Sequence, residues 1–389
     1  MRRIERSLWV LGTRLAAAAV LSALSVATSF AQDNQEKADS KEPPEARAVP
    51  IQLIRPHSMT GWETADRPSM GWTVDGEKLI GGVDSKPLVS DWTFGDFTLE
   101  LAWRTRSDGE LQVRLEQLPG RKRHVIASLN EGKQSGRVTD GDRVAANGRP
   151  LEPKADEYHQ TKIERHGDHL KVTTDGEVVA DVKLSGSAEH DRYGLTLHVP
   201  KGVALIRDVT VTEPLGEPLF NGTDLTGWWS QKKQDGWKVE NGELVGQRKG
   251  GNYLRSEREF GDFTLNFDYH ISKGGNSGVG LRTPREGWPS REGMELQILD
   301  RDGMNSGSQM SIYKHFPPLE RPDQSGQWNN VVIKADGRII TAWVNGQIAQ
   351  HRDTSTHKAI AGTPLSGWIG FQDHGAVMRI RNVYVHEAR

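Results

Sequence analysis

The sequence predicts an all-β protein made of two tandem β-sandwiches of the jelly-roll type. Three features of the chain support this prediction. Short segments alternate apolar and polar residues with a period of two, which is typical of strands with one buried face. Asn-Gly and Asp-Gly pairs, which favour tight hairpin turns, separate several of these segments. Finally, motifs of the first half recur in the second half in the same order, whereas no window of ten or more residues has a convincing helical period.

The N-terminus is typical of an export signal. Basic residues up to Arg14 precede an apolar run at 15–26, and small residues at 29 and 31 suit a signal peptidase. We therefore expect residues 1–31 to be a signal peptide and the mature protein to be periplasmic or extracellular. The alternative is an uncleaved anchor, but the apolar run is shorter than the ~20 residues that span a bilayer. The mature chain is expected to lack a transmembrane segment.

The next segment, residues 32–50, is charged, contains prolines and has no aromatic residue, so it is predicted to be a disordered linker. The whole chain of 389 residues is nearly balanced in charge, with 50 Lys and Arg against 52 Asp and Glu. This balance does not suggest a nucleic-acid partner. The absence of cysteine excludes disulfides, zinc–thiolate sites and thiol catalysis.

An internal repeat divides the rest of the chain. The motif TGW at 60–62 recurs at 226–228, and FGDFTL at 94–99 recurs at 260–265, each 166 positions later. We interpret residues 51–213 and 214–389 as two copies of one fold. Hairpin turns are expected at the pairs 75–76, 175–176, 241–242, 336–337 and 345–346, because a type I′ turn needs positive φ at both central residues.

The stretch 260–300 carries the most unusual polar residues, and it is predicted to form three strands. In the third strand Met294, Leu296 and Ile298 share the apolar face, which leaves Glu295 and Gln297 on the opposite face. In the second strand Arg282 lies opposite the apolar residues. Arg, Glu and Gln can bind a polar ligand or transfer a proton, so this face is the candidate site. A solvated strand face, or an ion pair between Arg282 and Glu295, is the structural alternative.

Further candidates flank this face. On the segment 369–374, Gln372 and His374 oppose the apolar residues, and the unperturbed pKa of histidine suits proton transfer near neutral pH. Asp373 lies on the apolar side and could instead cap a turn. Asn276 is in a glycine-rich turn, where turn chemistry is the alternative role. Trp288 is in a loop that the first copy lacks, and it could stack on a sugar.

With these residues, the C-terminal half resembles the 3-keto-disaccharide hydrolase domain, a concanavalin A-like jelly roll of exported bacterial proteins. The likeness covers most of 215–387 and rests on several short motifs together. These are LFNGTDLTGW at 219–228, NSG at 276–278, ELQILD at 295–300, GFQDHG at 370–375 and RNV at 381–383. The segment 311–318 lacks an expected glycine after its tyrosine, and the loop 283–293 has no counterpart. The N-terminal half is similar only in its scaffold, as a degenerate copy.

The resemblance implies a carbohydrate-active enzyme that cleaves glycosides oxidised at C3. A ketone at C3 acidifies the C2 proton, so a base can remove it while the leaving group departs from C1 and water then adds. For this chemistry we expect Glu295 to be the base and His374 the acid, or the two roles exchanged, and Arg282 to stabilise the enolate. The expected substrate-binding residues are Asn276, Arg282, Gln297, Gln372, Trp288 and Asp373.

Two other function classes remain open at this stage. A carbohydrate-binding, lectin-like protein without turnover could share the same fold. A conventional glycoside hydrolase would need two carboxylates at a set separation, and only Glu295 stands out. No cofactor is expected, although oxygen atoms of Asp300, Asp302 and Asn305 could hold a divalent cation. Their spacing matches no defined calcium loop.

Overall fold

A computed structural model describes residues 45–62, 71–118, 123–154, 156–186, 191–230, 236–249 and 252–387. The predicted signal peptide at 1–31 lies outside these residues, as does the predicted linker up to residue 44. In the described part of the chain, no helix has the length and apolar character that crossing a membrane would require.

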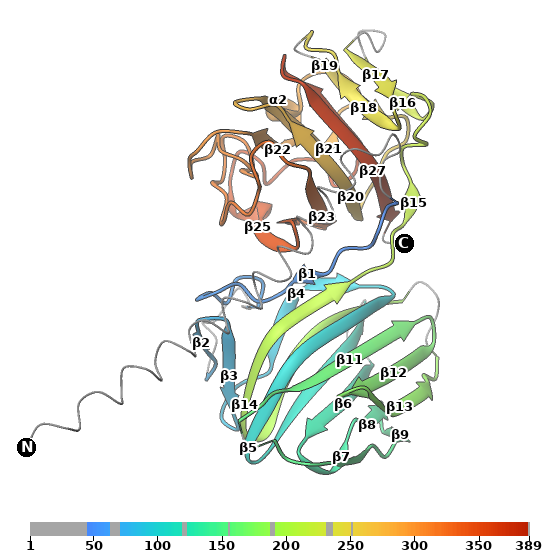
Figure 1. Cartoon of the computed structure of the whole chain (residues 1–389), viewed down its shortest axis with the longest axis vertical. Helices are drawn as coiled ribbons and strands as arrows, with labels where there is room; N and C mark the ends of the chain where they lie inside the picture. The colour runs from blue at the N-terminus through green and yellow to red at the C-terminus, as the bar shows by residue number, and fades with distance from the viewer. Residues whose placement is uncertain are drawn as a thin grey trace, which may run out of the picture.

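The architecture is all-β, as predicted, and two β-sandwiches follow one another along the long axis of the molecule (Figure 1). The strands of the N-terminal copy are β1 Ile51–Gln52, β2 Thr73–Asp75, β3 Lys78–Gly82, β4 Leu88–Phe94, β5 Phe97–Leu118, β6 His124–Asn130, β7 Gly132–Ser135, β8 Arg137–Asp140, β9 Arg143–Ala146, β10 Arg149–Leu151, β11 His159–His166, β12 His169–Thr174, β13 Glu177–Lys183 and β14 Arg192–Thr212.

Among its described residues, the C-terminal copy contains thirteen further strands and two single-turn helices. They are β15 Glu217–Pro218, β16 Trp228–Trp229, β17 Trp237–Glu240, β18 Glu243–Gly246, β19 Asn252–Ser256, β20 Phe263–Ile271, β21 Asn276–Thr283, α2 Pro289–Glu292, β22 Met294–Leu299, β23 Asn329–Asp336, β24 Ile339–Val344, β25 Gln347–Asp353, η1 Thr354–Thr356, β26 Trp368–Asp373 and β27 Met378–Glu387.

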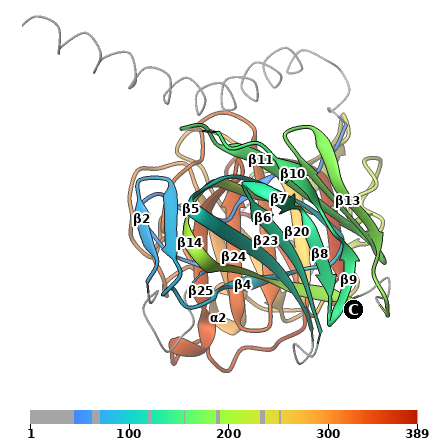
Figure 2. The same ribbon diagram turned by 90° about the horizontal axis from the view of Figure 1, so that it is seen from below.

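Two long strands organise the N-terminal copy. β5 and β14 pair antiparallel along most of their length, and Figure 2 shows them crossing the sandwich. Along one part of this pair, β5 is followed in the sheet by β11, β12 and β13. Along the other part, β14 pairs with β4 and β5 pairs with β6. Because the strands run uninterrupted from one layer into the other, the two layers form a single 12-stranded sheet.

The corresponding strands of the C-terminal copy are interrupted. The turn at 272–275 separates β20 from β21, and the turn at 374–377 separates β26 from β27. The copy therefore has an eight-stranded sheet, β17-β18-β27-β20-β23-β24-β25 with β15, and a separate five-stranded sheet, β16-β19-β26-β21-β22. Glycines with positive φ, Gly274 at +70° and Gly375 at +84°, occupy these turns. Both breaks lie at one end of the five-stranded sheet.

Each copy has its own hydrophobic core. In the C-terminal copy Phe263, Leu265, Phe267 and Tyr269 are buried on one face of β20, which confirms the predicted alternation. The N-terminal core extends across the boundary between the copies, since it includes Trp343 of β24. Trp343 lies beside Trp92 of β4, with ring centroids 5.8 Å apart. The two sandwiches thus share a buried aromatic contact.

The hairpin turns form at all five predicted pairs, but two of them are shifted by one residue. Asp175-Gly176, Asn241-Gly242 and Asn345-Gly346 occupy the two central positions with positive φ at both residues, as predicted. At 75–76 and 336–337, in contrast, the Asp ends the strand and the Gly becomes the first turn residue. A glycine at that position supplies the single positive φ of a II′-like turn, so aspartate does not need a strained backbone.

Candidate functional site

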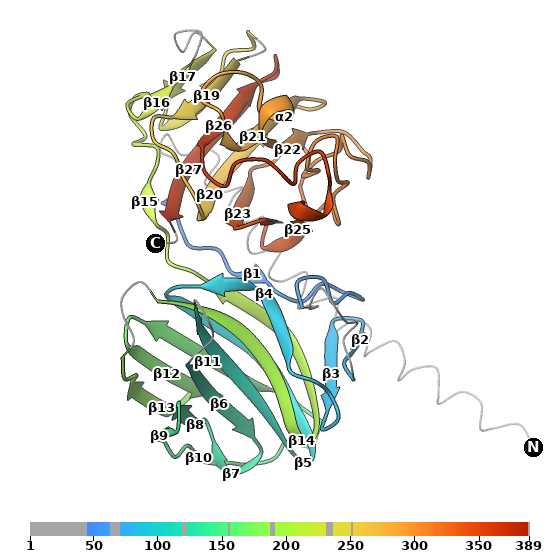
Figure 3. The same ribbon diagram turned by 180° about the vertical axis from the view of Figure 1, so that it is seen from behind.

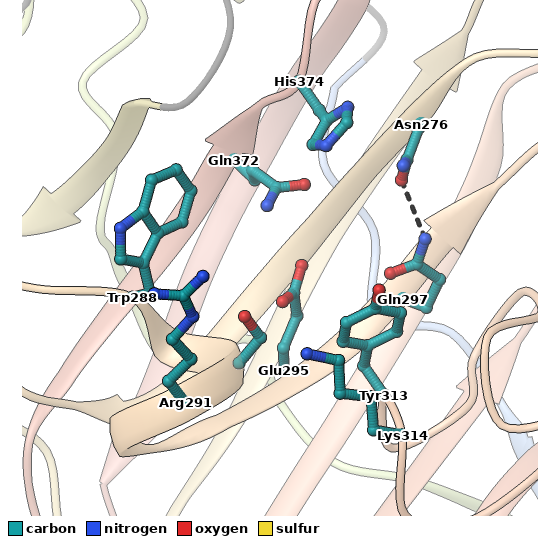
Figure 4. A pocket seen from close by; sticks show the side chains of 10 residues that line it. Asn276, Trp288, Arg291, Glu295, Gln297, Tyr313, Lys314, Gln372 and His374 are labelled. Carbon is teal, nitrogen blue, oxygen red and sulfur yellow. Dashed lines mark hydrogen bonds between the residues drawn. The ribbon is translucent and has the colours of Figure 1, made fainter.

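A pocket of about 220 Å³ opens on the five-stranded sheet of the C-terminal copy, and Figure 4 shows its side chains from close by. Its lining is mostly polar. The residues are Asn276, Trp288, Ser290, Arg291, Glu295, Gln297, Tyr313, Lys314, Gln372 and His374. Six of these ten are residues that the sequence singled out: Glu295, His374, Asn276, Gln297, Gln372 and Trp288. The structure brings them together from β21, β22, the end of β26 and the loop that contains α2, which lies beside β22 in Figure 3.

Glu295 lies at the centre of this pocket because of the period of its strand. Its neighbours Met294 and Leu296 point into the hydrophobic core, so the Glu295 side chain points to the other face of β22. The carboxyl group occupies space that Gly278 of β21 leaves open. A Cβ atom on Gly278 would lie 2.1 Å from Oε1 of Glu295. The glycine is therefore required for the observed position of the carboxylate.

We expect Gly278→Ala to displace the Glu295 carboxylate and to lower activity by about 100-fold, the order of loss that an error of 1 Å in position can cause. The backbone should accept the substitution, since Gly278 does not have positive φ. Turnover and thermal stability of the purified variant would be compared with those of Gly362→Ala. That control also adds a methyl group, but at a glycine with no atom within 4 Å of the added Cβ. Equal activity in the two variants would contradict the spatial role of Gly278.

The environment of Glu295 changes its acidity. Burial, with only 4 % of the residue exposed, raises the pKa of the carboxyl group to about 7. A hydrogen bond from Tyr253 of β19 and the charge of Lys314 act in the opposite direction but are weaker. The amide Nε2 of Gln372 donates to the Tyr253 hydroxyl at 2.7 Å, which leaves the hydroxyl proton for Glu295. The relay from Gln372 through Tyr253 therefore orients the carboxylate.

Removing the hydroxyl of Tyr253 should make Glu295 a weaker acid. The hydroxyl stabilises the ionised carboxylate, and a hydrogen bond to a charged group contributes about 1.5 kcal/mol. Tyr253→Phe is thus expected to raise the pKa of Glu295 by about one unit. The phenyl ring would keep its edge contact with Trp288, whose centroid lies 6.2 Å away. Titration of the carboxyl carbon by NMR would measure the shift, and an unchanged or lower pKa would contradict this role.

The other predicted residues surround Glu295. Gln297 donates from Nε2 to Oδ1 of Asn276 at 2.7 Å, so the Nδ2 group of Asn276 and Oε1 of Gln297 are available to a ligand. Trp288 is 38 % exposed and forms one wall beside Arg291, while the exposed His374 lies next to Gln372 at another edge of the pocket (Figure 4). Figure 4 thus shows a carboxyl group, Glu295, and an imidazole, His374, in a pocket that also contains amide groups and an indole.

The prediction for Arg282 is wrong, because the residue does not line the pocket. Its buried guanidinium donates to Oδ1 of Asp262 at 2.7 Å and to the carbonyl of Gly261 at 2.8 Å. The cause is local. Arg282 has a φ of +47° and the pairing of β21 with β26 shifts register there, so the alternation ends before this residue. Arg282 therefore connects the start of β20 to the neighbouring hairpin, and its ion-pair partner is Asp262 rather than Glu295.

Asp373 also has a structural position, which was the alternative weighed for it. Its side chain is fully buried and does not line the pocket. Oδ2 accepts from the backbone N–H of Lys249 at 2.9 Å, and Oδ1 accepts from that of Gly375 at 3.1 Å. Asp373 thus stabilises the turn that follows β26 and places His374, without facing a ligand itself.

Sequence reasoning missed several residues of the site: Tyr253, Ser290, Arg291, Tyr313 and Lys314. Tyr313 and Lys314 belong to the segment noted for its missing glycine, and Lys314 has a φ of +69°, a value at which glycine is common. Tyr253 alternates with the buried Leu254, so period two would have placed it on the polar face. Its contact with Glu295 depends on β19 lying next to β26, which no local pattern indicates.

The residues considered for a cation, Asp300, Asp302 and Asn305, lie in the segment that follows β22. Within the described part of the chain, no group of three or more His, Cys, Asp or Glu side chains is arranged to hold a metal ion. Oδ2 of Asp300 accepts from the N–H of Gly274 at 2.8 Å, and Oδ1 of Asn305 accepts from that of Gly307 at 2.8 Å. Both side chains stabilise turns.

Several solved structures are similar to one copy of this chain. Two are proteins from Parabacteroides distasonis that are provisionally named glycosyl hydrolases. They are 24 % and 23 % identical, cover 43 % and 44 % of this chain and 92 % and 98 % of their own, and have TM-scores of 0.39 and 0.40. A carbohydrate-binding module from Bacillus subtilis is 20 % identical, with coverage of 40 % of this chain and 96 % of its own and a TM-score of 0.33. No curated protein matches the chain.

A protein family described as the 3-keto-alpha-glucoside-1,2-lyase-like domain matches the chain twice, over residues 51–211 and 216–386. The two matches correspond to the two sandwiches, and together they cover most of the 389 residues. The chain therefore belongs to the family of 3-keto-alpha-glucoside-1,2-lyase-like domains.

Proposed function

We propose that the C-terminal copy cleaves 3-keto-glycosides by elimination across C1 and C2, followed by hydration. The observation that carries this proposal is a buried carboxyl group with a pKa of about 7 in a pocket comparable in size with a single hexose ring. A general base works best when its pKa is close to the working pH. An ordinary exposed glutamate would be a much weaker base at neutral pH.

In the first step Glu295 takes the proton from C2, and the electrons of that C–H bond form an enolate with oxygen at C3. A cation near the developing negative charge would lower the barrier. Arg282 does not have this position. Lys314 lines the pocket and lies close enough to Glu295 to lower its pKa, so we assign it this role in place of Arg282.

In the second step the enolate re-forms the C3 ketone and the bond from C1 to the leaving oxygen breaks. His374 would donate a proton to that oxygen, since it lines the pocket next to Gln372. The product is an enone with a double bond between C1 and C2. Water then adds its oxygen to C1 and a proton to C2, which gives the free 3-keto-sugar. Every atom in this sequence comes from substrate, water or the two proton-transfer residues.

Binding would depend on the remaining lining residues. Trp288 presents an exposed indole on which a sugar ring can stack, and the free amide groups of Asn276 and Gln297 can bind hydroxyl groups. Glu295 is the sole carboxylate among the described residues that line the pocket. A conventional glycosidase mechanism, which needs two, is thus not favoured. The basic and apolar segments before residue 31 support export to the periplasm or beyond.

The proposal is tested by incubating the purified protein with a 3-keto-glucoside and, separately, with the same glucoside carrying a hydroxyl at C3. We expect release of the aglycone from the 3-keto substrate alone, because the C2 proton is acidic only beside a ketone. Equal release from both glucosides would refute the elimination mechanism. Binding of the 3-keto-glucoside without release of the aglycone would instead show a lectin-like protein.

A further inference from the structure

The N-terminal copy lacks the catalytic residues but contacts the C-terminal copy close to the pocket. Arg114 of β5 corresponds to Gly280 of β21, 166 positions later in the repeat. Arg114 pairs with Ile126 of β6 and Gly280 pairs with Glu295 of β22, so Ile126 occupies the position of Glu295. His198 of β14 likewise takes the place of Gln372. The first copy thus retains the scaffold without the base. Its contacts with the second copy include β23, β24, β25 and the segment that follows residue 310.

The segment 310–320 forms the wall of the pocket that contains Tyr313 and Lys314. Two positive φ values, +55° at Met310 and +69° at Lys314, show that its backbone is held in an uncommon conformation. Such conformations persist only where surrounding contacts stabilise them. On the pocket side, the N–H of Tyr313 donates to the carbonyl of Glu295 at 2.9 Å. The segment also pairs with Gln297 of β22 through Met310 and Ser311, and the N–H of Lys314 donates to the carbonyl of Ser306 at 2.7 Å. Further contacts come from His357, from β25 and from the N-terminal copy.

β25 contacts both the segment and the N-terminal copy, because successive side chains of a strand point in opposite directions. The buried Gln350 points to the segment and donates from Nε2 to the carbonyls of Met310, at 3.1 Å, and Pro317, at 3.0 Å. The next residue, His351, points to the N-terminal copy, where its Nε2 lies 3.0 Å from Oδ2 of Asp91. The strand therefore connects the first copy to the pocket wall.

The hydrogen bonds around His351 have a defined direction. Nε1 of Trp92 donates to the Thr341 hydroxyl at 3.0 Å, which leaves the hydroxyl proton for Nδ1 of His351 at 2.8 Å. Nε2 of His351 then carries a proton and donates to Asp91. All of these groups except Asp91 are buried. A buried and fully paired polar network of this kind favours one arrangement of the two copies.

A second contact holds the end of the segment directly. Arg55, which follows β1, donates from Nε to Oε1 of Glu320 at 2.9 Å and from Nη2 to the carbonyl of Leu319 at 3.2 Å. The N–H of Leu319 in turn donates to the carbonyl of Ala349 on β25 at 2.8 Å. Leu319 is thus held between the edge strand of the C-terminal sheet and an arginine of the other copy.

We propose that the N-terminal copy is a scaffold that holds the segment 310–320, and with it Tyr313 and Lys314, in place at the pocket. The inference rests on the proposed function only in treating this pocket as the active site. It assigns the degenerate copy a positioning role, in which Arg55 and Asp91 act through the segment and through β25 without touching the substrate. It also gives a reason why the two copies remain in one chain.

Hydrogen exchange of the full-length protein tests this role. In the double variant Arg55→Ala/Asp91→Ala, we expect the amides of Tyr313, Lys314 and Leu319 to exchange roughly 5- to 30-fold faster, which corresponds to the loss of two modest polar contacts. Amides in β20 should be unchanged. The control is Arg104→Ala, since Arg104 likewise donates to a carboxylate and a carbonyl, both of Asp156 and remote from the pocket. If the double variant fails to fold, Arg55→Ala alone serves the same test.

A second readout separates positioning from general stability. Lys314 lowers the pKa of Glu295, so a loosened segment should raise that pKa in the Arg55 and Asp91 variants but not in Arg104→Ala. Carboxyl NMR measures it without any substrate. Unchanged amide exchange in 310–320 would overturn the scaffold role, whether or not the protein cleaves 3-keto-glucosides. Faster exchange in a protein that never cleaves 3-keto-glucosides would support the scaffold role and refute the proposed function.

Discussion

Glu295→Gln should lower turnover of a 3-keto-glucoside by about 100- to 10,000-fold, the range that a general base contributes. Glutamine has nearly the same shape but cannot take the C2 proton. Its Oε1 can still accept from Tyr253, so the pocket should keep its form. Steady-state kinetics with a 3-keto-glucoside would measure the loss. Adding Gln297→Glu to this variant should not restore turnover, because residue 297 lies two positions further along β22. Wild-type turnover in Glu295→Gln would show that Glu295 is not the base.

The same substitution should stabilise the protein at alkaline pH. The folded-state pKa of Glu295, about 7, is above the ordinary glutamate value of 4.5, so the folded protein binds the proton more tightly than the unfolded chain. The free energy of unfolding therefore decreases as the pH rises from about 4.5 to about 7, and it stays at the lower value above that range. At about 1.4 kcal/mol per pKa unit, Glu295→Gln should gain on the order of 3 kcal/mol at pH 8 and almost nothing at pH 4. Denaturant unfolding at the two pH values measures this difference.

His374→Asn should reduce turnover by a similar factor, about 100- to 10,000-fold, but only for substrates with poor leaving groups. Protonation by His374 matters most when the departing oxygen would otherwise leave as a strongly basic alkoxide. A 3-keto-glucoside of an alcohol should thus lose far more rate than one of a nitrophenol, whose anion is stable without a proton. His374 is exposed at the end of β26, so thermal stability should hardly change.

Comparison of the two aglycones provides an internal control for that variant. An equal loss with both leaving groups would place His374 in substrate binding or in the folding of the turn, and would contradict its role as acid. Asp373→Asn is a useful companion, because Asp373 holds the turn through Lys249 and Gly375 rather than facing the pocket. Because it would act through misplacement of His374, it should reduce turnover more with the alcohol aglycone than with the nitrophenol.

Local patterns predicted most of the fold. The alternation of β20 and β22 and the recurrence of the Phe-Gly-Asp motif were sufficient for two sandwiches of the observed class. The separation of β20 from β21 was predicted, because 260–300 was expected to form three strands, but the uninterrupted strands of the first copy were not predicted. Two hairpin turns, at 75–76 and 336–337, were displaced by one residue, and in both the glycine supplies the positive φ.

Strand period predicted part of the pocket lining, and the loop and turn that are specific to the second copy predicted Trp288 and Asn276. Glu295 and Gln297 follow from the alternation of β22, and Gln372 from that of β26. The same rule failed at Arg282, where a positive φ ends the alternation. Tyr253 and Lys314 could not be predicted, since their approach to Glu295 depends on which strands are neighbours and on how a long loop folds over the sheet.

The fate of the C2 hydrogen is the most direct test of the central claim, that cleavage proceeds through removal of the C2 proton by Glu295. A 3-keto-glucoside deuterated at C2 would be cleaved in ordinary water, and the sugar product analysed by mass spectrometry, with Glu295→Gln and a reaction without protein as controls for spontaneous exchange. Elimination followed by hydration replaces the C2 deuterium with hydrogen from water, at a rate that exceeds both controls. A wild-type product that keeps its deuterium at C2 would mean direct displacement at C1, and would contradict the mechanism.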